Sequence, residues 1–180
     1  MRKIFSLLFM TTFLFVSCSD DGEVGPQGPE GPPGEDGVNG LGYTFEQTVD
    51  FDYLEDANQY SVIIDIPDDV ATINPDADAV LVYRLEILED ENGNDLDGWS
   101  LIPQNFFLEE GTIQYVYNHT VGDVEIIIDG NYNLSNLDSG FTDGQTFRIV
   151  VVPSDTFASS EVDPANMEAV LKAFQLKTKK

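Results

Sequence analysis

From Tyr43 onward, hydrophobic and polar residues alternate with a period of two, which is typical of β-strands with one buried face. The pattern predicts eight strands, whose apolar positions are Phe45, Val49 and Phe51; Val62, Ile64 and Ile66; Leu81, Tyr83, Leu85 and Ile87; residues 99–102; residues 106–108; Ile113, Tyr115 and Tyr117; Val124, Ile126 and Ile128; and Phe147, Ile149 and Val151. In the third strand, Arg84 and Glu86 are expected to face the opposite way. Polar turn clusters such as 67–69, 91–94 and 142–144 separate the strands. Short strands at this spacing predict an antiparallel β-sandwich.

Near the C-terminus the period changes to that of an α-helix. Met167, Val170, Leu171 and Phe174 are apolar with helical spacing, at i, i+3, i+4 and i+7. Asp163 is expected to cap this helix and Pro164 to occupy its first position. The apolar stripe should then pack on the sandwich, so the pattern predicts a mainly β head with one C-terminal helix over residues 43–180.

The first residues have the organisation of a secretory signal. Arg2 and Lys3 precede an apolar run over residues 4–16, and Ser17 is a small residue at the end of that run. The run is too short for a membrane span, which needs about 20 apolar residues. Residues 1–17 are therefore predicted to be a signal peptide that is removed.

Cys18 is the only cysteine of the chain, so it has no partner for an intramolecular disulfide. Residues 15–18, Phe-Val-Ser-Cys, resemble a bacterial lipobox, in which signal peptidase II cuts before a cysteine that then carries acyl chains; Phe15 stands where the motif usually has leucine. This resemblance implies lipidation of Cys18 and a membrane anchor. Within the segment 18–21, Ser19, Asp20 and Asp21 resemble the acidic export signal of Bacteroidota lipoproteins, which implies display on the cell surface. The alternative is that these acids solvate a linker and the protein stays on the periplasmic face.

A strict Gly-X-Y repeat follows over residues 22–42, with glycine at Gly22, Gly25, Gly28, Gly31, Gly34, Gly37 and Gly40. This is the collagen pattern, because only glycine fits at the crowded axis of three polyproline II strands. Four acidic residues occupy X and Y positions of the repeat, namely Glu23, Glu30, Glu35 and Asp36. The repeat contains no lysine that could pair with them. Two interpretations remain open for this stalk: a homotrimer held together through the heads, or an extended single-chain spacer.

The charge balance is strongly acidic, with 33 Asp and Glu against 8 Lys and Arg and a formal net charge of −25. Binding to nucleic acid depends on clustered cations, and the one basic cluster is Lys177, Lys179 and Lys180 at the C-terminal end. Nucleic acid is therefore not an expected partner. Residues 43–180 are enough for one domain with its own core.

Catalytic signatures are missing from the sequence, which has a single histidine, His119, and neither a nucleophile elbow nor a paired-histidine metal motif. We therefore expect a protein that is not an enzyme and needs no cofactor. Calcium is the exception to consider, because Asp90, Asn92 and Asn94 match the first three ligand places of an EF-hand.

The rest of that EF-hand pattern does not match, since Asp95 replaces the required glycine and Leu101 stands at the place of the bidentate glutamate. A looser oxygen cage remains an alternative, with ligands drawn from Asp90, Asn92, Asn94, Asp95 and Asp97. The other interpretation of this stretch is a solvated hairpin turn, in which Asn92 and Gly93 adopt positive φ angles.

Trp99 is the only tryptophan and lies between Gly98 and Ser100. Its ring could be a platform on which a sugar stacks, or it could be part of the hydrophobic core. Large aromatic side chains contribute mainly through burial, which favours the core.

Taken together, the lipobox, the acidic segment, the collagen triplets and the β-rich head resemble the collagen-like lipoproteins of Bacteroidota, especially those of flavobacteria. Within the head the resemblance rests on residues 82–84, 99–103 and 147–153. The family implies no catalytic activity. We therefore expect an outer-membrane lipoprotein on the cell surface with a structural or binding role, whose glycan or protein ligand the sequence does not name. The alternative is a glycan-binding or glycan-hydrolysing accessory lipoprotein.

Overall fold

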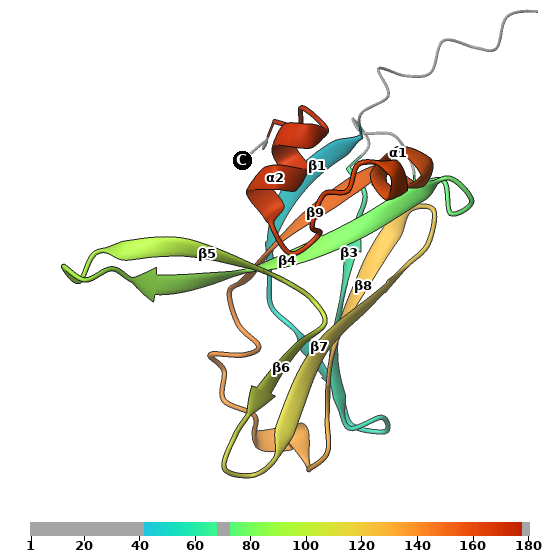
Figure 1. The fold of residues 1–180 in the computed structure, drawn as a ribbon. Helices are drawn as coiled ribbons and strands as arrows, with labels where there is room; N and C mark the ends of the chain where they lie inside the picture. Colours follow the sequence, from blue (N-terminus) through green and yellow to red (C-terminus); the bar gives the residue numbers. More distant parts are fainter. Residues whose placement is uncertain (1–41, 68–72, 178–180) are drawn as a thin grey trace, which may run out of the picture. The chain divides into compact units, whose positions relative to one another are not determined.

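Two antiparallel β-sheets lie face to face, and two helices lie beside one of them (Figure 1). This computed structural model describes residues 42–67 and 73–177, all within one compact unit of the chain. The predictions for Cys18, for Ser19, Asp20 and Asp21, and for the glycines from Gly22 to Gly40 lie outside the described residues. For the head, the predicted mainly β fold with two antiparallel sheets is confirmed.

The four-stranded sheet, called sheet A, has the order β1 (Tyr43–Val49), β9 (Gln145–Pro153), β4 (Asp78–Glu89) and β5 (Asp95–Leu101). The five-stranded sheet, called sheet B, has the order β2 (Asp52–Leu54), β3 (Gln59–Asp65), β8 (Asp123–Gly130), β7 (Thr112–His119) and β6 (Gln104–Phe107). The strand that the pattern missed is β2, because three residues are too few to show an alternation. A short 3₁₀ helix, η1 (Leu134–Asn136), lies between β8 and β9.

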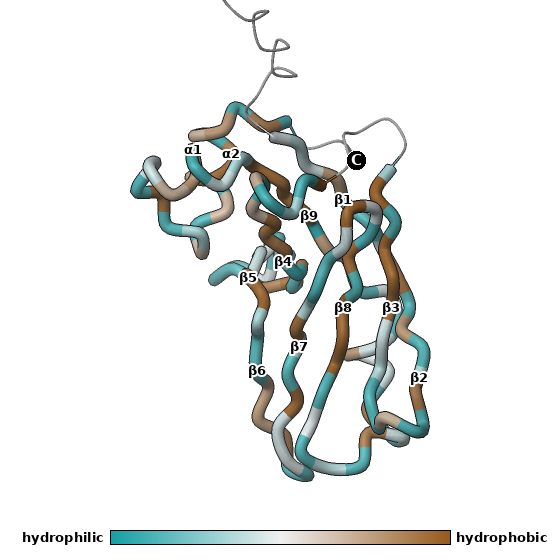
Figure 2. Tube along the Cα trace, turned by 90° about the vertical axis from the view of Figure 1, so that its right-hand side faces the viewer, coloured by the Kyte–Doolittle hydropathy of each residue, from teal (hydrophilic) through white to brown (hydrophobic). Residues whose placement is uncertain are grey.

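The main core, called the inner cluster, fills the space between the two sheets. Figure 2 shows the hydrophobic stretches that β8 and β3 contribute to it. Phe147 of β9 is fully buried there, and its ring centroid lies 6.0 Å from that of Phe51 and 6.2 Å from that of Tyr115. The alternating residues of both sheets therefore meet as the sequence pattern predicted, with Val82, Ile113, Ile126, Ile128 and Ile149 among the fully buried members.

A second core, called the outer cluster, covers the other face of sheet A. Leu81 and Tyr83 of β4 and Val150 and Val152 of β9 point toward α2 (Met167–Ala173) on this face. The central strands of sheet A are thus buried on both faces. Arg84, expected to face away from the core, instead lies on the inner face at 7% exposure, because each face of β4 has a layer of protein against it.

The C-terminal helix α2 starts three residues later than the sequence predicted. Asn166 caps it, since its side-chain oxygen accepts a hydrogen bond from the Ala169 N–H at 3.0 Å. Asp163 instead accepts from the Ala165 N–H in the preceding turn, and the Pro164 carbonyl accepts a hydrogen bond from the Tyr83 hydroxyl at 2.6 Å. The predicted cap was therefore wrong, because Asn166 satisfies the first turn in its place.

The predicted apolar stripe of α2 packs as expected, with Met167, Val170 and Phe174 buried. A six-residue helix, α1 (Ser154–Ser159), directly follows β9 and was too short to show a helical period. Its Phe157 ring lies 6.0 Å from that of Phe174, between centroids. In the described part of the chain, no helix has the length and apolar character needed to cross a membrane.

Candidate functional site

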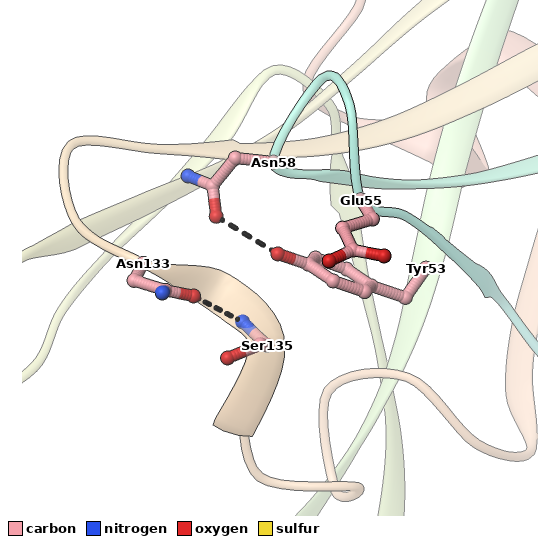
Figure 3. Close-up of a pocket in the computed structure, with 5 residues that line it drawn as sticks. All are labelled: Tyr53, Glu55, Asn58, Asn133 and Ser135. Carbon is pink, nitrogen blue, oxygen red and sulfur yellow. Dashed lines mark hydrogen bonds between the residues drawn. The ribbon is translucent and has the colours of Figure 1, made fainter.

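An open hollow of about 420 Å³ lies at the end of sheet B and is called the Tyr53 hollow (Figure 3). Its lining comes from two places in the chain. Tyr53, Glu55 and Asn58 belong to the β2–β3 hairpin, while Asn133 and Ser135 lie at the start of η1. Sequence reasoning missed this hollow because no local motif links segments so far apart.

Asn58 holds the two sides of the Tyr53 hollow together. Its side-chain oxygen accepts hydrogen bonds from the Tyr53 hydroxyl at 3.2 Å and from the Leu134 N–H at 2.8 Å, and its amide nitrogen donates to the Tyr132 carbonyl at 2.8 Å. The residue has a φ of 53°, a left-handed conformation that asparagine tolerates better than most residues. Asn58 therefore contributes to the architecture of the hollow, and its main hydrogen-bonding groups are engaged within the protein.

The remaining polar groups of the hollow are more accessible. The Asn133 side-chain oxygen accepts from the Ser135 N–H at 2.9 Å and so caps η1, whereas Glu55 is exposed beside the Tyr53 ring (Figure 3). The Tyr53 ring itself packs on Tyr60, with 5.0 Å between ring centroids. The hollow can therefore offer a carboxylate, an amide donor and an aromatic edge to a small polar ligand.

The five residues proposed for a calcium cage lie on the β4–β5 hairpin. One oxygen of the Asp90 carboxylate accepts from the Asn92 and Asn94 N–H groups, both at 2.8 Å, and the other accepts from the Asn94 side-chain amide at 2.8 Å. These bonds, with the Asn94 side chain first, lower the pKa of Asp90 to about 2. The Asp90 carboxylate is therefore engaged with its own turn.

The two remaining aspartates of the proposed cage lie on β5. Asp95 lies opposite Glu89, and Asp97 lies opposite Ile87. Over residues 42–67 and 73–177, no group of three or more His, Cys, Asp or Glu side chains is arranged to hold a metal ion.

The turn itself has three residues between Asp90 and Asn94, which are joined by a backbone hydrogen bond of 2.9 Å from the Asp90 N–H. Of the two turn residues expected to adopt positive φ, Gly93 does so at 78° and Asn92 does not. A type I turn followed by a left-handed glycine explains this, because only the third loop residue then needs the left-handed conformation.

Trp99 lies on β5 and is half-buried in the outer cluster. The guanidinium carbon of Arg148 is 3.9 Å from the centroid of its ring. The same guanidinium donates two hydrogen bonds to one Glu46 oxygen, at 2.6 and 3.0 Å, and one to the Met167 sulfur at 2.9 Å. A buried cation thus covers one face of the Trp99 ring, which packs against the outer cluster.

Arg84 forms a second buried polar centre, on the inner face of sheet A. It donates to the Gln145 side-chain oxygen at 2.9 Å and to Glu86 at 3.1 Å, and its guanidinium lies 4.8 Å from the Tyr115 ring centroid. Burial raises the pKa of Tyr115 to about 12, and the positive charge of Arg84 opposes that shift. The Tyr115 hydroxyl donates to the Phe141 carbonyl, so this centre ties both sheets to the loop before β9.

His119 is the last residue of β7 and is half-buried. Its Nδ1 atom is buried and has no hydrogen-bond partner among the described residues.

Comparisons with protein-family models, curated proteins and solved structures found no match for this chain. The resemblance to collagen-like lipoproteins therefore stays a prediction, and the residues that carry it most sharply lie outside the described part. Function has to be inferred from the chemistry of this chain alone.

Proposed function

We propose that this protein is a lipoprotein of the outer membrane, anchored through acyl chains on Cys18, that displays its acidic head on a collagen-like stalk as a non-catalytic binding module on the cell surface. The observation that best supports this role is the placement of charge in the head. Among the described residues, the buried charged side chains are Arg84 and Arg148, whereas every acidic side chain is at least partly exposed.

This placement gives the head an anionic exterior over a core in which the cations are already paired. Such a surface repels other anionic macromolecules and attracts cationic partners over distances of about 10 Å at moderate salt. The two buried arginines are paired with Glu86 and Glu46 inside the head, so their positive charge does little to offset the negative charge of the surface. The head is thus suited to presenting a stable, acidic binding surface.

The anchor can be tested by substituting Cys18→Ser and fractionating the cells. We expect the variant to move from the membrane fraction to the soluble fraction, because two or three acyl chains, at about 0.8 kcal/mol per buried methylene, are what retain the protein. A Ser17→Ala variant is the control, since it keeps a small residue before the cysteine. Membrane retention of the Cys18→Ser protein would contradict the proposed anchor.

On whole cells, replacing Asp20 and Asp21 by alanine should protect the head from added protease if those residues direct surface export.

A second candidate function is glycan binding, and the Tyr53 hollow is the observation that favours it. A carboxylate, an amide and an aromatic ring around a hollow of about 420 Å³ are groups that sugars use as partners. A glycan screen with the whole chain and with Glu55→Ala tests this function. A glycan that binds the parent protein and at least about tenfold more weakly the variant would support it, and equal binding by both would place the sugar site elsewhere.

A further inference from the structure

The β4–β5 hairpin extends beyond the rest of sheet A. β4 pairs with β9 from Asp78 to Arg84, and with β5 from Tyr83 to Glu89. Residues 85–89 and 95–99 therefore pair only with each other, and Figure 1 shows this ribbon standing out from the sandwich. We call residues 85–99 the arm. A two-stranded ribbon of this kind has two edges on which backbone groups are free to bind another strand.

Two backbone hydrogen bonds, one at each end of the β4–β5 ladder, show which backbone groups of β5 face outward. The Ile102 N–H donates to the Val82 carbonyl, and the Asp90 N–H donates to the Asn94 carbonyl, both at 2.9 Å. In an antiparallel pair, such bonded positions alternate with positions whose N–H and C=O groups point the other way. In β5, Leu96 and Gly98 therefore face β4, while the backbone groups of Asp95, Asp97 and Trp99 face the outer edge, where sheet A ends.

The two faces of the arm have different chemistry. One face carries Asp95 opposite Glu89 and Asp97 opposite Ile87, which is 59% exposed. The other carries Leu88 and Leu96, which lie opposite each other at 53% and 50% exposure. Since side chains alternate between faces along a strand, a strand added beside β5 would place its residues in turn beside the acids and beside the leucines.

The charge of the arm argues against a second copy of this chain as the added strand. The arm contains Glu86, Glu89, Asp90, Glu91, Asp95 and Asp97 and no basic residue. Like charges on facing strands are destabilising, and charged edges are a common means by which proteins prevent edge-to-edge association. A cationic strand would reverse the sign of this interaction and would cover the exposed leucines as well.

We propose that the outer edge of β5, from Asp95 to Trp99, binds an extended segment of a partner protein in which lysine or arginine alternates with apolar residues. The segment adds to sheet A as a strand, with its cations beside Asp95 and Asp97 and its apolar side chains beside Leu96 and Leu88. This inference rests on the proposed binding role of the head and specifies its partner. It is independent of the anchor, because fractionation of Cys18→Ser tests the anchor without any ligand.

The probe for this site is a fluorescent seven-residue peptide in which lysine and valine alternate, titrated into the whole protein and followed by anisotropy. A peptide of the same composition, with its lysines and valines in two blocks, is the control for simple charge attraction. We expect the alternating peptide to bind at least about tenfold more tightly, because only its order matches both faces of the arm at once.

Two substitutions at Asp97 separate charge from backbone pairing. Asp97→Asn removes the charge and should weaken binding by up to about fivefold, the range of a cross-strand charge pair. Asp97→Pro also removes the outward N–H and should weaken binding by about a further five- to tenfold, the range of a lost hydrogen bond. Proline is tolerated on an edge strand where its missing N–H faced solvent, so the β4–β5 ladder should persist.

Hydrogen exchange on the unsubstituted protein gives a second measurement, which does not depend on how the proline variant folds. The bound peptide should slow exchange at the Asp97 and Trp99 amides and leave the already bonded Leu96 and Gly98 amides unchanged. Equal binding of the two peptides, equal affinities of Asp97→Asn and Asp97→Pro, or protection confined to other strands would each overturn the proposal. Failure of the alternating peptide to bind would also overturn it.

Discussion

Replacing Phe147 by alanine is expected to lower the free energy of unfolding of the head by about 3–5 kcal/mol. The side chain is fully buried at the centre of the inner cluster and packs edge-on against Phe51. β9 pairs with β1 on one side and β4 on the other, so the backbone cannot easily close the cavity that the truncation leaves. Chemical denaturation followed by tryptophan fluorescence or circular dichroism measures the change.

Phe107 provides a matched control, because it is the same residue type on a strand of the other sheet but is 85% exposed. Phe107→Ala should change the free energy of unfolding by about 0.5 kcal/mol or less, as surface substitutions usually do. Similar losses in the two variants would mean that the inner cluster is not the main source of stability.

Replacing Arg148 by methionine is expected to destabilise the head by about 3 kcal/mol. Arg148 links three elements, since it pairs with Glu46 of β1, covers Trp99 of β5 and donates to Met167 of α2. Its loss leaves the carboxylate of Glu46, a side chain only 17% exposed, without its cation. Thermal and chemical denaturation of the variant should show the loss, and α2 should exchange its amide hydrogens faster.

The double variant Arg148→Met with Glu46→Leu tests whether the unpaired carboxylate is the cause. Replacing both partners of a buried ion pair by apolar residues is often close to neutral, so the double variant should recover about half or more of the lost stability. A double variant less stable than Arg148→Met alone would show that Glu46 does not depend on Arg148, and that the loss comes from packing alone.

Some features of the head are local in origin, and these were predictable from the chain. The alternation in residues such as Ile113, Tyr115, Val124 and Ile126 predicted the strands and their buried faces, because a period of two follows directly from strand geometry. The stripe of α2 was predictable for the same kind of reason. The position of its cap was not, because Asp163 and Asn166 are both good caps and only the path of the preceding turn decides between them.

The candidate sites depend on contacts between segments that are distant in the sequence. Asn58 and Leu134, which meet at the Tyr53 hollow, are 76 positions apart, and no periodic pattern connects them. The hairpin turn at Asp90 was recognisable from its residues, but the free edge of the arm was not. That edge exists because β5 is the last strand of sheet A, with β4 on one side and no strand on the other.

The sequence by itself determined the signal-like N-terminus, the collagen triplets, the acidic balance and the order of strands and helix along the chain, since each of these depends only on neighbouring residues. Only the tertiary structure decided that β4 and β9 are buried on both faces, that Arg84 and Arg148 lie inside, and that β5 ends sheet A with an open edge. The physical reason is that an alternating pattern shows which residues share a face, while the layer that covers this face comes from segments distant in sequence.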